Sequence, residues 1–568
     1  MIFPDVRKNA HHFVSLCFLL GRSAKLNLTT SSLPKPTMMM MRSAKSSLPC
    51  TILLLLHFAF SRFPLLFAFS PSDGGSLQHA CRSGHPRCSL PPLYAQSQQV
   101  GLDPPNLNIA IVGVGPSGLL LAHLLLQEQK NVKVHLFERR SDPRLEKTEQ
   151  RAYALGLGIR GRTAIRQVDD VLWEAVRKVG YESERFQLHI GGLVIPLRSE
   201  NDSSDNVEPS VLLYRTKLCA AMTEELERRY GTTNRDLKLT FDRMIESCDL
   251  ESMKISTNAG VDNRKETFGP FDLIVGCDGV NSVVRQSMKN SWSKFESEVN
   301  QIPGEFKVVQ LKDIPPGVDP SAVSLMIPKS GSVTAFVEPT GNGTCCVLFA
   351  GKRDSPLLSN TNNSTAMKES LQEAYPKWEG EILDEMVEQL MGQKVTGTAS
   401  SVVCNTYHYS DKAVLTGDAA HATGGVSGQG VNSALIDSVV LADCIAKNRA
   451  SISNALMSYS QKQVPEGKAI YDLSFGPKPG GLKGVKLLLL NARDTLFRGR
   501  WGIGQPPLQT RLTTTLTSFS EIRREKDNFY PEKFPDDSEF NEMLKKLHAE
   551  SAESLSGNDA TESTALAQ

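Results

Sequence analysis

Short apolar runs that end in glycine recur along the middle of the chain. The first, NIAIVGVGPSGLLLAHLLLQ at 108–127, changes from a β-type run through a glycine turn into a helical apolar pattern. A second strand, KVHLFE, follows at 133–138, and buried strands run into glycine turns at 271–279 and 413–417. Strands that alternate with helices predict a parallel α/β sheet, and a glycine-rich turn after its first strand indicates a Rossmann-like domain.

A different pattern fills the gaps between these units. FQLHIGGLVIPL at 186–197 and three apolar runs within 322–351 are separated by glycine and proline turns, which predicts successive antiparallel strands. In one of these runs, alternation sends the side chains of Cys345 and Cys346 to opposite faces of the sheet. Segment 364–392 has helical periodicity with acidic residues outside, as expected of a pair of covering helices.

The N-terminal hundred residues have the composition of a targeting segment. Between Val6 and Asn106 the only acidic residues are Asp73 and Asp103. An apolar run at 52–60 follows basic residues and has the length of a signal peptide core, and AFSP stands at 68–71. The arrangement resembles the bipartite presequence of diatom-type plastids. An ordinary signal peptide for the secretory pathway or a membrane anchor is the alternative, and in the plastid interpretation the mature chain keeps no transmembrane anchor.

Composition narrows the class of protein. The chain has 568 residues, of which 22% are charged and 40% hydrophobic, values ordinary for a soluble globular enzyme. A net charge of +1 provides no field that would attract nucleic acid or an anionic membrane. The eleven cysteines include no C-x-x-C pair, so neither a zinc site nor a disulfide framework is indicated.

The first glycine turn carries the chemistry of a dinucleotide site. Gly113 permits the tight turn, Gly115 lets the backbone approach a pyrophosphate, and Gly118 lets the helix pack on the strand. The helix N-terminus then faces the phosphates. Glu138 ends the second strand, twenty residues beyond Gly118, where a carboxylate accepts hydrogen bonds from ribose hydroxyls. This motif by itself does not separate FAD from NAD.

Two later motifs separate these cofactors. FDLIVGCDGVNSVVR at 271–285 places Asp278 and Gly279 at a strand end, where the carboxylate can reach ribose and pyrophosphate groups. Its Arg285 either holds the loop or neutralises phosphate, whereas helix capping by Asp278 or Ser282 is the alternative for that turn. The third motif begins at Asp418, which is placed to bind ribityl hydroxyls.

The backbone amides of this third motif can meet the flavin ring at a helix N-terminus. The residues concerned lie around Gly428, Gln429 and Gly430, within TGDAAHATGGVSGQGVNSALID. We expect His421 in the same segment to be structural rather than a catalytic base.

The three motifs, in this order and spacing, resemble the class A FAD-dependent monooxygenases, or flavoprotein hydroxylases. Across about 105–525 the chain is most similar to the kynurenine 3-monooxygenase family. The resemblance implies FAD as cofactor, NADPH or NADH as transient reductant, and dioxygen and a small molecule as substrates. It assigns Arg215, in LLYRTKL, to flavin contact, and we assign Arg139 and Asn432 to the same cofactor site. The flavin carries the chemistry, so no catalytic residue is assigned, and no metal is expected.

The resemblance also predicts the division into domains. The fold class is α/β, with a discontinuous Rossmann-like FAD-binding domain, an inserted antiparallel-sheet substrate domain and C-terminal helices. The expected ranges are 1–104 for the leader, 105–180, 211–295 and 405–450 for the FAD-binding domain, 181–210 and 296–404 for the substrate domain, 451–530 for the C-terminal helical region, and 531–568 for a largely disordered tail.

The substrate pocket departs from the family pattern. Kynurenine 3-monooxygenases hold the substrate's amino acid group with an arginine, tyrosines and an asparagine. Arg185 matches the arginine only with a one-residue ambiguity, and Asn432 matches the asparagine. Leu197 follows Pro196 where the family has tyrosine, and the segment FGPKPGG, directly after DLS at 472–474, contains no tyrosine. We therefore expect hydroxylation or epoxidation of an aromatic or isoprenoid compound other than kynurenine.

Other activities on the same scaffold are the alternatives. A flavin-dependent reductase or halogenase would share the FAD motifs, although RWGIGQPP at 500–507 lacks the paired tryptophans of halogenases. A flavin-binding regulatory protein with little turnover is the alternative from another class. Coupling of NADPH oxidation to an oxygenated product separates these possibilities.

Overall fold

The computed structural model describes only part of the chain. The described residues are 106–128, 131–145, 153–198, 208–231, 236–259, 265–341, 343–353, 355–359, 363–393, 397–497, 504–506 and 508–549. The predicted leader at 1–104 and residues 550–568 of the predicted tail lie outside these ranges, so the targeting prediction stays a prediction.

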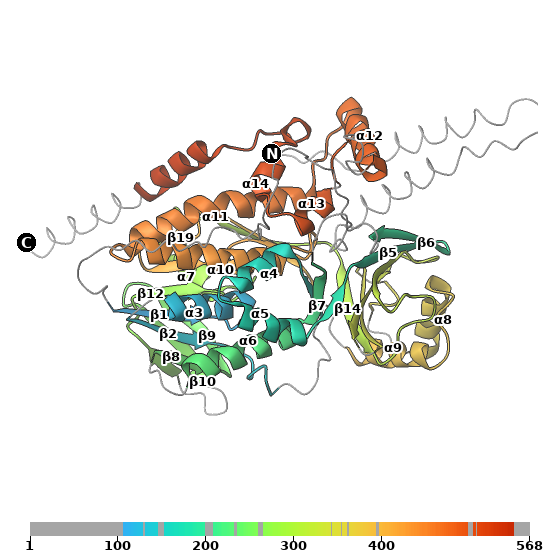
Figure 1. Cartoon of the computed structure of the whole chain (residues 1–568), viewed down its shortest axis with the longest axis horizontal. Coiled ribbons are helices and arrows are strands. Elements are labelled where there is room, and N and C mark those ends of the chain that lie inside the picture. The colour runs from blue at the N-terminus through green and yellow to red at the C-terminus, as the bar shows by residue number, and fades with distance from the viewer. Residues whose placement is uncertain are drawn as a thin grey trace, which may run out of the picture. The chain divides into compact units, whose positions relative to one another are not determined.

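A six-stranded sheet in the order β19-β20-β12-β1-β2-β8 forms the centre of the nucleotide-binding part (Figure 1). All of its pairings are parallel except that of β19 with β20. Its strands come from distant parts of the chain, which makes this sheet discontinuous in sequence. They are β1 (Leu107–Val112), β2 (Val132–Phe137), β8 (Leu237–Thr240), β12 (Leu273–Gly276), β19 (His408–Tyr409) and β20 (Ala413–Leu415).

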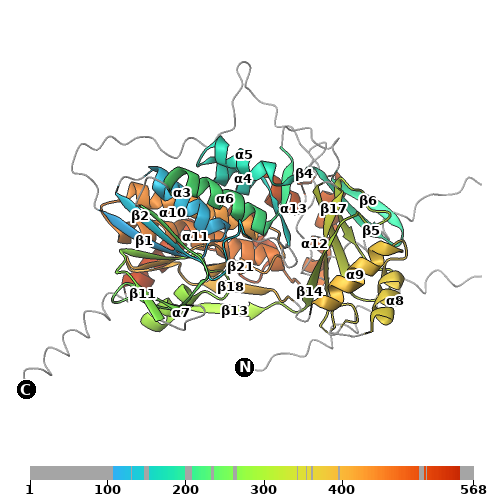
Figure 2. The same ribbon diagram turned by 90° about the horizontal axis from the view of Figure 1, so that it is seen from below.

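Helices and a small sheet lie on opposite sides of β1 and β2 (Figure 2). Helix α3 (Pro116–Glu128) packs against α6 (Arg215–Tyr230) and α10 (Gly430–Lys447) on one side. On the other side, Phe268 makes edge contacts with the rings of His135 and Phe137 on β2. Phe268 belongs to the antiparallel sheet of β9 (Arg243–Asp249), β10 (Lys254–Ala259) and β11 (Lys265–Phe268), beside which lies α7 (Val283–Ser291). The parallel sheet is thereby shielded on both faces.

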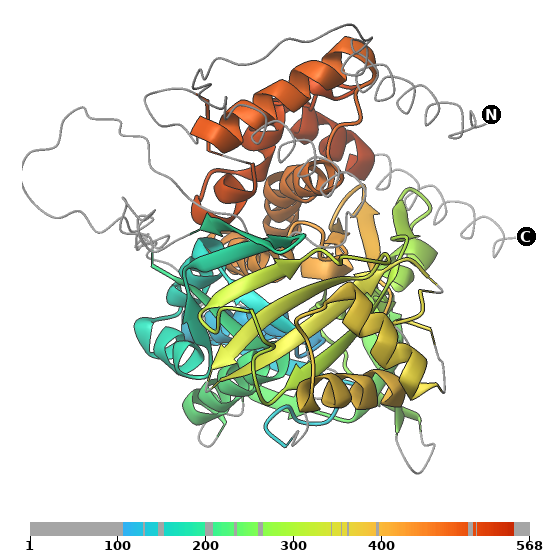
Figure 3. The ribbon, with the colours of Figure 1, turned by 90° about the vertical axis from the view of Figure 1, so that its right-hand side faces the viewer.

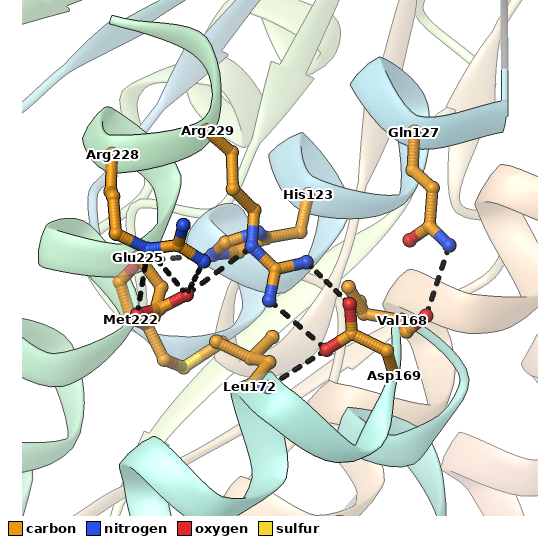
Figure 4. A network of polar contacts seen from close by, with 9 residues as sticks. All are labelled: His123, Gln127, Val168, Asp169, Leu172, Met222, Glu225, Arg228 and Arg229. Atoms are coloured by element: carbon orange, nitrogen blue, oxygen red, sulfur yellow. Dashed lines mark hydrogen bonds and ion pairs between the residues drawn. The ribbon is translucent and has the colours of Figure 1, made fainter.

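A network of ion pairs fixes the end of α6 that lies away from the glycine turn (Figure 4). Arg229 donates to both carboxylate oxygens of Asp169, at 2.7 and 3.0 Å, and also pairs with Glu225. Asp169 in turn accepts from the backbone N–H of Leu172 and caps α5 (Asp170–Lys178). His123 of α3 is buried against the carbonyl oxygen of Met222, and burial lowers its pKa to about 4. These contacts hold α3, α5 and α6 together and so orient the first residue of α6, Arg215.

The second six-stranded sheet has the order β14-β17-β16-β15-β5-β6. The predicted antiparallel pairing is correct for every neighbour except β5 and β15, which run parallel. The prediction is wrong there because β5 and β15 are separated by more than a hundred residues, so no hairpin joins them. The strands are β5 (Arg185–Ile190), β6 (Leu193–Arg198), β14 (Glu305–Leu311), β15 (Ala322–Met326), β16 (Thr334–Gly341) and β17 (Thr344–Gly351).

The two faces of this second sheet have different partners. Helices α8 (Ser364–Ala374) and α9 (Glu381–Gly392) lie across one face, here called the outer face, as predicted (Figure 3). Cys345 belongs to the core beneath these helices, and Cys346 belongs to a cluster on the opposite face, which confirms that their side chains diverge. That opposite face is called the inner face, and its members include Phe186, Leu188, Val323, Leu325, Phe336, Glu338, Cys346 and Leu348.

Two three-stranded sheets complete the connections. One has the order β3-β7-β4, and its residues Leu212, Ala154 and Tyr214 pack against the inner face. The other has the order β13-β18-β21. Their strands are β3 (Ala154–Leu157), β4 (Tyr181–Ser183), β7 (Ser210–Tyr214), β13 (Ser297–Gln301), β18 (Ser400–Cys404) and β21 (Ala422–Thr423), and α4 (Ile159–Arg166) follows β3.

Helices follow α10 to the end of the described chain. They are α11 (Ile452–Phe475), α12 (Gly481–Phe497), α13 (Leu508–Thr514), α14 (Phe519–Arg524), the 3-10 turn η4 (Asp527–Phe529) and a helix over 537–549. The prediction of a disordered tail from 531 is wrong over 531–549, because Phe534, Phe540 and Leu544 are buried in the main core. None of the described helices is long and apolar enough to span a bilayer.

Candidate functional site

The three sequence motifs meet at the carboxyl ends of the parallel strands. The hydroxyl of Ser117, in the first glycine turn, lies 2.8 Å from that of Thr416 and 2.9 Å from that of Ser438. The thiol of Cys277, in the second motif, lies 3.2 Å from the hydroxyl of Thr416. Segments up to 321 residues apart are therefore joined by direct polar contacts. In parallel α/β sheets this edge is where ligands bind.

Each glycine of the first turn has a distinct structural reason. Gly113 has φ +105°, and a Cβ there would lie 2.3 Å from the carbonyl oxygen of Cys277. A Cβ on Gly118 would lie 2.2 Å from the carbonyl oxygen of Gly113. Gly115 is different, because its Cβ would meet only the guanidinium Nη2 of Arg215, at 3.3 Å. Two of the glycines are needed by the fold itself, and Gly115 leaves space open at the site.

Glu138 braces the glycine turn. One carboxylate oxygen accepts from the backbone N–H of Val114 and the other from that of Arg140, both at 3.0 Å. A carboxylate has about four acceptor positions, so capacity remains for ribose hydroxyls. Arg139 beside it is exposed.

Asp278 has both capping and unpaired oxygens. Its Oδ2 accepts from the backbone N–H of Val283 at 2.6 Å and Ser282 accepts from that of Arg285, so both act as caps for α7. Asp278 Oδ1 is buried without a hydrogen-bond partner among the described residues. Burial raises the pKa of this carboxyl. An orphaned buried oxygen is costly unless a ligand satisfies it, and Gly279 follows directly in the turn.

Arg285 fastens the second motif to the third. Its guanidinium is buried, and it donates to the carbonyl oxygen of Ala419 at 2.9 Å and also to that of Val280. Burial lowers its pKa. Of the two roles open from sequence, loop holding is the one that these contacts support.

A cluster without hydrogen bonds or ion pairs among its members is formed by Asp418, Arg215 and Tyr153. None of the three has a hydrogen bond or ion pair within the described part of the chain, and the side chains of Asp418 and Tyr153 are exposed. Burial raises the pKa of Asp418, against lowering by His421 and Arg215, and burial also raises the pKa of Tyr153. These side chains are thus accessible to solvent yet surrounded by protein, as expected of groups that bind a ligand. Tyr153 directly precedes β3 and belongs to none of the three sequence motifs, so only the folded structure brings it to the site.

A buried ion pair between His421 and Asp437 fixes the backbone next to Asp418. The Nε2 of His421 lies 2.7 Å from Oδ2 of Asp437, which also accepts from the backbone N–H of Gly417 at 2.9 Å. Burial alone would lower the pKa of His421, but the Asp437 carboxylate raises it, and the net pKa is above its ordinary value. The prediction that His421 has a structural role agrees with this geometry.

Asn432 connects α10 to the start of α4. Its Oδ1 accepts from the backbone N–H groups of Gly158 and Gly161 at 3.0 and 3.2 Å, and its Nδ2 donates to the carbonyl oxygens of Gly156 and Gly428. These four contacts use the whole amide. They position Gly428 and Gly430, the latter being the first residue of α10, beside the Asp418 loop.

The side chain of Arg185 lies on the outer face of the second sheet. It pairs with Asp319 at 2.9 Å and donates to the hydroxyl of Ser321 at 2.7 Å. Gln187, two residues on, also contacts Asp319, whereas Phe186 between them faces inward. Alternation along β5 therefore turns Arg185 away from the three converging motifs. The part of the chain that the structure describes holds no cluster of three or more metal-ligating side chains.

Fold and site together define a class of protein. A parallel sheet with a glycine turn, an acid at the end of β2 and two further acids at the same edge, beside a sheet-and-helix insertion, is the architecture of FAD-dependent monooxygenases, a class of oxidoreductases. The profile of the family described as an FAD binding domain matches residues 106–474. The chain belongs to this family.

Relatives in sequence are kynurenine 3-monooxygenases. The protein of Salinispora tropica is 29% identical over 374 residues, covering 64% of this chain and 78% of its own. That of Sus scrofa is 26% identical over 379 residues, covering 65% and 74%.

Solved structures agree on the fold. The tetrameric form of 2-methyl-3-hydroxypyridine-5-carboxylic acid oxygenase superposes with a TM-score of 0.52 at 17% identity, over 69% of this chain and 97% of that one. PqsL of P. aeruginosa, solved in complex with 2-aminobenzoylacetate, has a TM-score of 0.50 at 20% identity over 65% and 95%.

Proposed function

We propose that this enzyme uses NAD(P)H and dioxygen to hydroxylate or epoxidise a small aromatic or isoprenoid compound. The observation that carries the proposal is the set of unsatisfied groups at one sheet edge. Asp278 Oδ1, Asp418 and Arg215 lack partners among the described residues, and the space beside Gly115 is open. Carboxylates, a cation and free backbone amides are the groups that a ribityl diphosphate requires.

Each group has a role in holding FAD. The turn of Gly113, Gly115 and Gly118 and the N-terminus of α3 would bind the pyrophosphate. Glu138 would accept from the ribose hydroxyls, and Asp278 Oδ1 would accept from a ribose hydroxyl or lie against the pyrophosphate region. Asp418 would accept from the ribityl hydroxyls, with the amides near Gly428 and Gly430 toward the ring. Arg215 would offset the charge of the cofactor.

Bound FAD supplies the redox chemistry, taking electrons from NAD(P)H and activating dioxygen. The chain contributes position and exclusion of water. The apolar inner face of the second sheet packs on β3 and β7, whose neighbouring residues Tyr153 and Arg215 belong to the cofactor cluster. Side chains such as Phe336 and Leu348 would enclose the reacting ring of the substrate in a dry environment.

We expect the chain expressed from about residue 100 to purify yellow and to oxidise NADPH in response to its substrate. The measurements are FAD in the denatured supernatant, NADPH consumption and the mass of the product. As a matched variant, Asp418→Ala removes a charge-assisted hydrogen bond worth about 1.5–3 kcal/mol, so FAD affinity should fall about 10- to 150-fold. A colourless protein, or one that binds NAD instead of FAD, would exclude the proposal.

We further expect that kynurenine is not a productive substrate. A carboxylate in a dry pocket needs charge-assisted partners. Arg185 is paired on the outer face, and Asn432 is saturated by backbone contacts. The check is NADPH oxidation with L-kynurenine and chromatographic detection of 3-hydroxykynurenine. Coupled formation of that product at rates typical of enzymes, about 1 s⁻¹ or more, would contradict this expectation.

A further inference from the structure

One carboxyl group stands alone on the inner face of the second sheet. Glu338 lies on β16 two residues after Phe336 and directly opposite Cys346 of β17 in the antiparallel register. Phe336 and Cys346 both belong to inner-face clusters, so alternation puts Glu338 on that face as well. Phe336 and Leu348 lie on the same face, and Gln310 of β14 lies opposite Cys346. Its burial is not expected from the sequence, because an acid in a strand is ordinarily a solvent-facing residue.

Glu338 has none of the partners that a buried structural acid normally has. Its side chain is 5% exposed, and no described residue gives it a hydrogen bond or an ion pair. Lys307, on β14, donates instead to the carbonyl oxygen of Leu390 beneath the outer-face helices, and Arg185 is held by Asp319. Burial raises the pKa of Glu338 to about 8, which favours the neutral form of the carboxyl group over the ionised form at pH 7. Unpaired buried acids are rare in stable cores and are concentrated at functional sites.

The position of Glu338 connects it to the cofactor cluster. Cys346, its cross-strand neighbour, packs in one cluster with Ala154 and Tyr214. Ala154 follows Tyr153 in the chain, and Tyr214 precedes Arg215. The charges of Tyr153 and Arg215 shift each other's pKa, and the charge of Asp418 shifts the pKa of both. The inner face around Glu338 thus packs against the strand pair β3 and β7, which borders the expected flavin site.

We propose that Glu338 is a specificity-determining residue, whose carboxyl group hydrogen-bonds a hydroxyl or carbonyl oxygen on an otherwise apolar ring substrate. The inference rests on the proposed monooxygenase function and narrows its substrate class. A neutral carboxyl both donates and accepts one hydrogen bond, so it suits an uncharged oxygen function. Arg198, which the register places opposite Phe186 on this face, lies on β6, three strands away from β16 in the sheet order. The hydrogen bond would set which ring carbon is presented to the flavin.

The test uses the FAD-loaded enzyme and four compounds that share one ring system. These are naphthalene, 2-naphthol, 2-naphthoate and 2-naphthylmethylamine. Binding is read from the change in the visible absorption of bound FAD, and turnover from NADPH oxidation. We expect 2-naphthol to bind about tenfold more tightly than any of the others, the value of one net hydrogen bond of about 1.4 kcal/mol.

Three variants at two positions of the same strand separate recognition from structure. Glu338→Leu should reduce the preference for 2-naphthol over naphthalene to about one, with FAD content unchanged and the unfolding temperature the same or higher, since it removes an unpaired buried polar group. Glu338→Gln should retain part of the preference. Thr334→Val removes a buried hydroxyl from the same face, and it should leave the preference intact.

Several outcomes would overturn the inference. They are strongest binding by 2-naphthoate or by the amine, an unchanged preference in Glu338→Leu, a lower unfolding temperature in that variant, or no response of the flavin to any of the four compounds. A yellow enzyme that oxidises NADPH but gives one of these results rejects the role of Glu338 alone. A protein without FAD would reject the proposed function itself.

Discussion

Gly115→Val should abolish FAD retention in a protein that still folds, whereas Gly118→Ala should prevent the same domain from folding stably. A Cβ on Gly115 meets only the mobile end of Arg215, at 3.3 Å, so the apoprotein can accept the larger side chain. The valine would occupy the space through which the backbone approaches the pyrophosphate. A Cβ on Gly118 would instead lie 2.2 Å from a backbone oxygen of the first strand turn. Relief of that overlap requires backbone movement and should cost about 3 kcal/mol or more.

Far-ultraviolet circular dichroism and urea unfolding report the fold, and FAD per polypeptide reports the site. Gly392→Ala is the matched control, because an added Cβ at that helix end meets nothing within 4 Å. It should change neither measurement. The distinction between the two glycines is disproved if Gly115→Val loses the fold as Gly118→Ala does. It is also disproved if Gly115→Val retains full FAD occupancy.

Asp437→Ala should lower the free energy of unfolding by about 3–5 kcal/mol, the usual cost of removing one partner from a buried ion pair. Asp437 is 1% exposed and holds both His421 and the backbone N–H of Gly417. Asp437 and His421 also border a cavity of about 50 Å³, which the truncation would enlarge. FAD retention should weaken as well, because Gly417 directly precedes Asp418.

The pH dependence of stability identifies the charge on His421. Its pKa is raised in the folded protein, so the stabilisation from this pair is fully present below the ordinary imidazole value of about 6.5 and is lost as pH rises through the folded pKa. The difference in unfolding free energy between wild type and Asp437→Asn should therefore be larger at pH 6 than at pH 9. Asp411→Ala, at an exposed position, should change stability by about 0.5 kcal/mol or less at both. A difference independent of pH would mean that His421 is neutral.

The local chemistry of the cofactor site could be predicted from sequence because it resides in short segments. Gly113, Gly115, Gly118 and Glu138 belong to one strand, turn, helix and strand, and their spacing alone places them together. The strand-end positions of Asp278 and Asp418 follow from the same pattern. The outward helices at 364–392 and the divergence of Cys345 from Cys346 follow from periodicities of 3.6 and 2 residues.

Tertiary structure decided what distant segments do to one another. The sequence leaves two roles open for Arg285, holding a loop or binding phosphate. The structure favours the first, because Arg285 donates to the carbonyl oxygen of Ala419, 134 residues further along the chain. The sequence places the amide of Asn432 at the ligand site, but in the folded chain the backbone of 156–161 uses it. In each case the partner lies far away in sequence, so no local pattern contains it.

The faces of the second sheet were likewise undetermined by sequence. Alternation says that neighbours on a strand point in opposite directions, but only the packing of the whole sheet says which direction leads to the flavin. That choice puts Arg185 beneath the outer layer with Asp319 and leaves Glu338 among apolar side chains on the inner face. The sequence by itself determined the cofactor and the class of fold, because glycine turns and strand-end acids are local. Which face of the second sheet lies against β3 and β7, and so the surroundings of Glu338, was decided by packing between segments more than a hundred residues apart, which only the folded chain brings together.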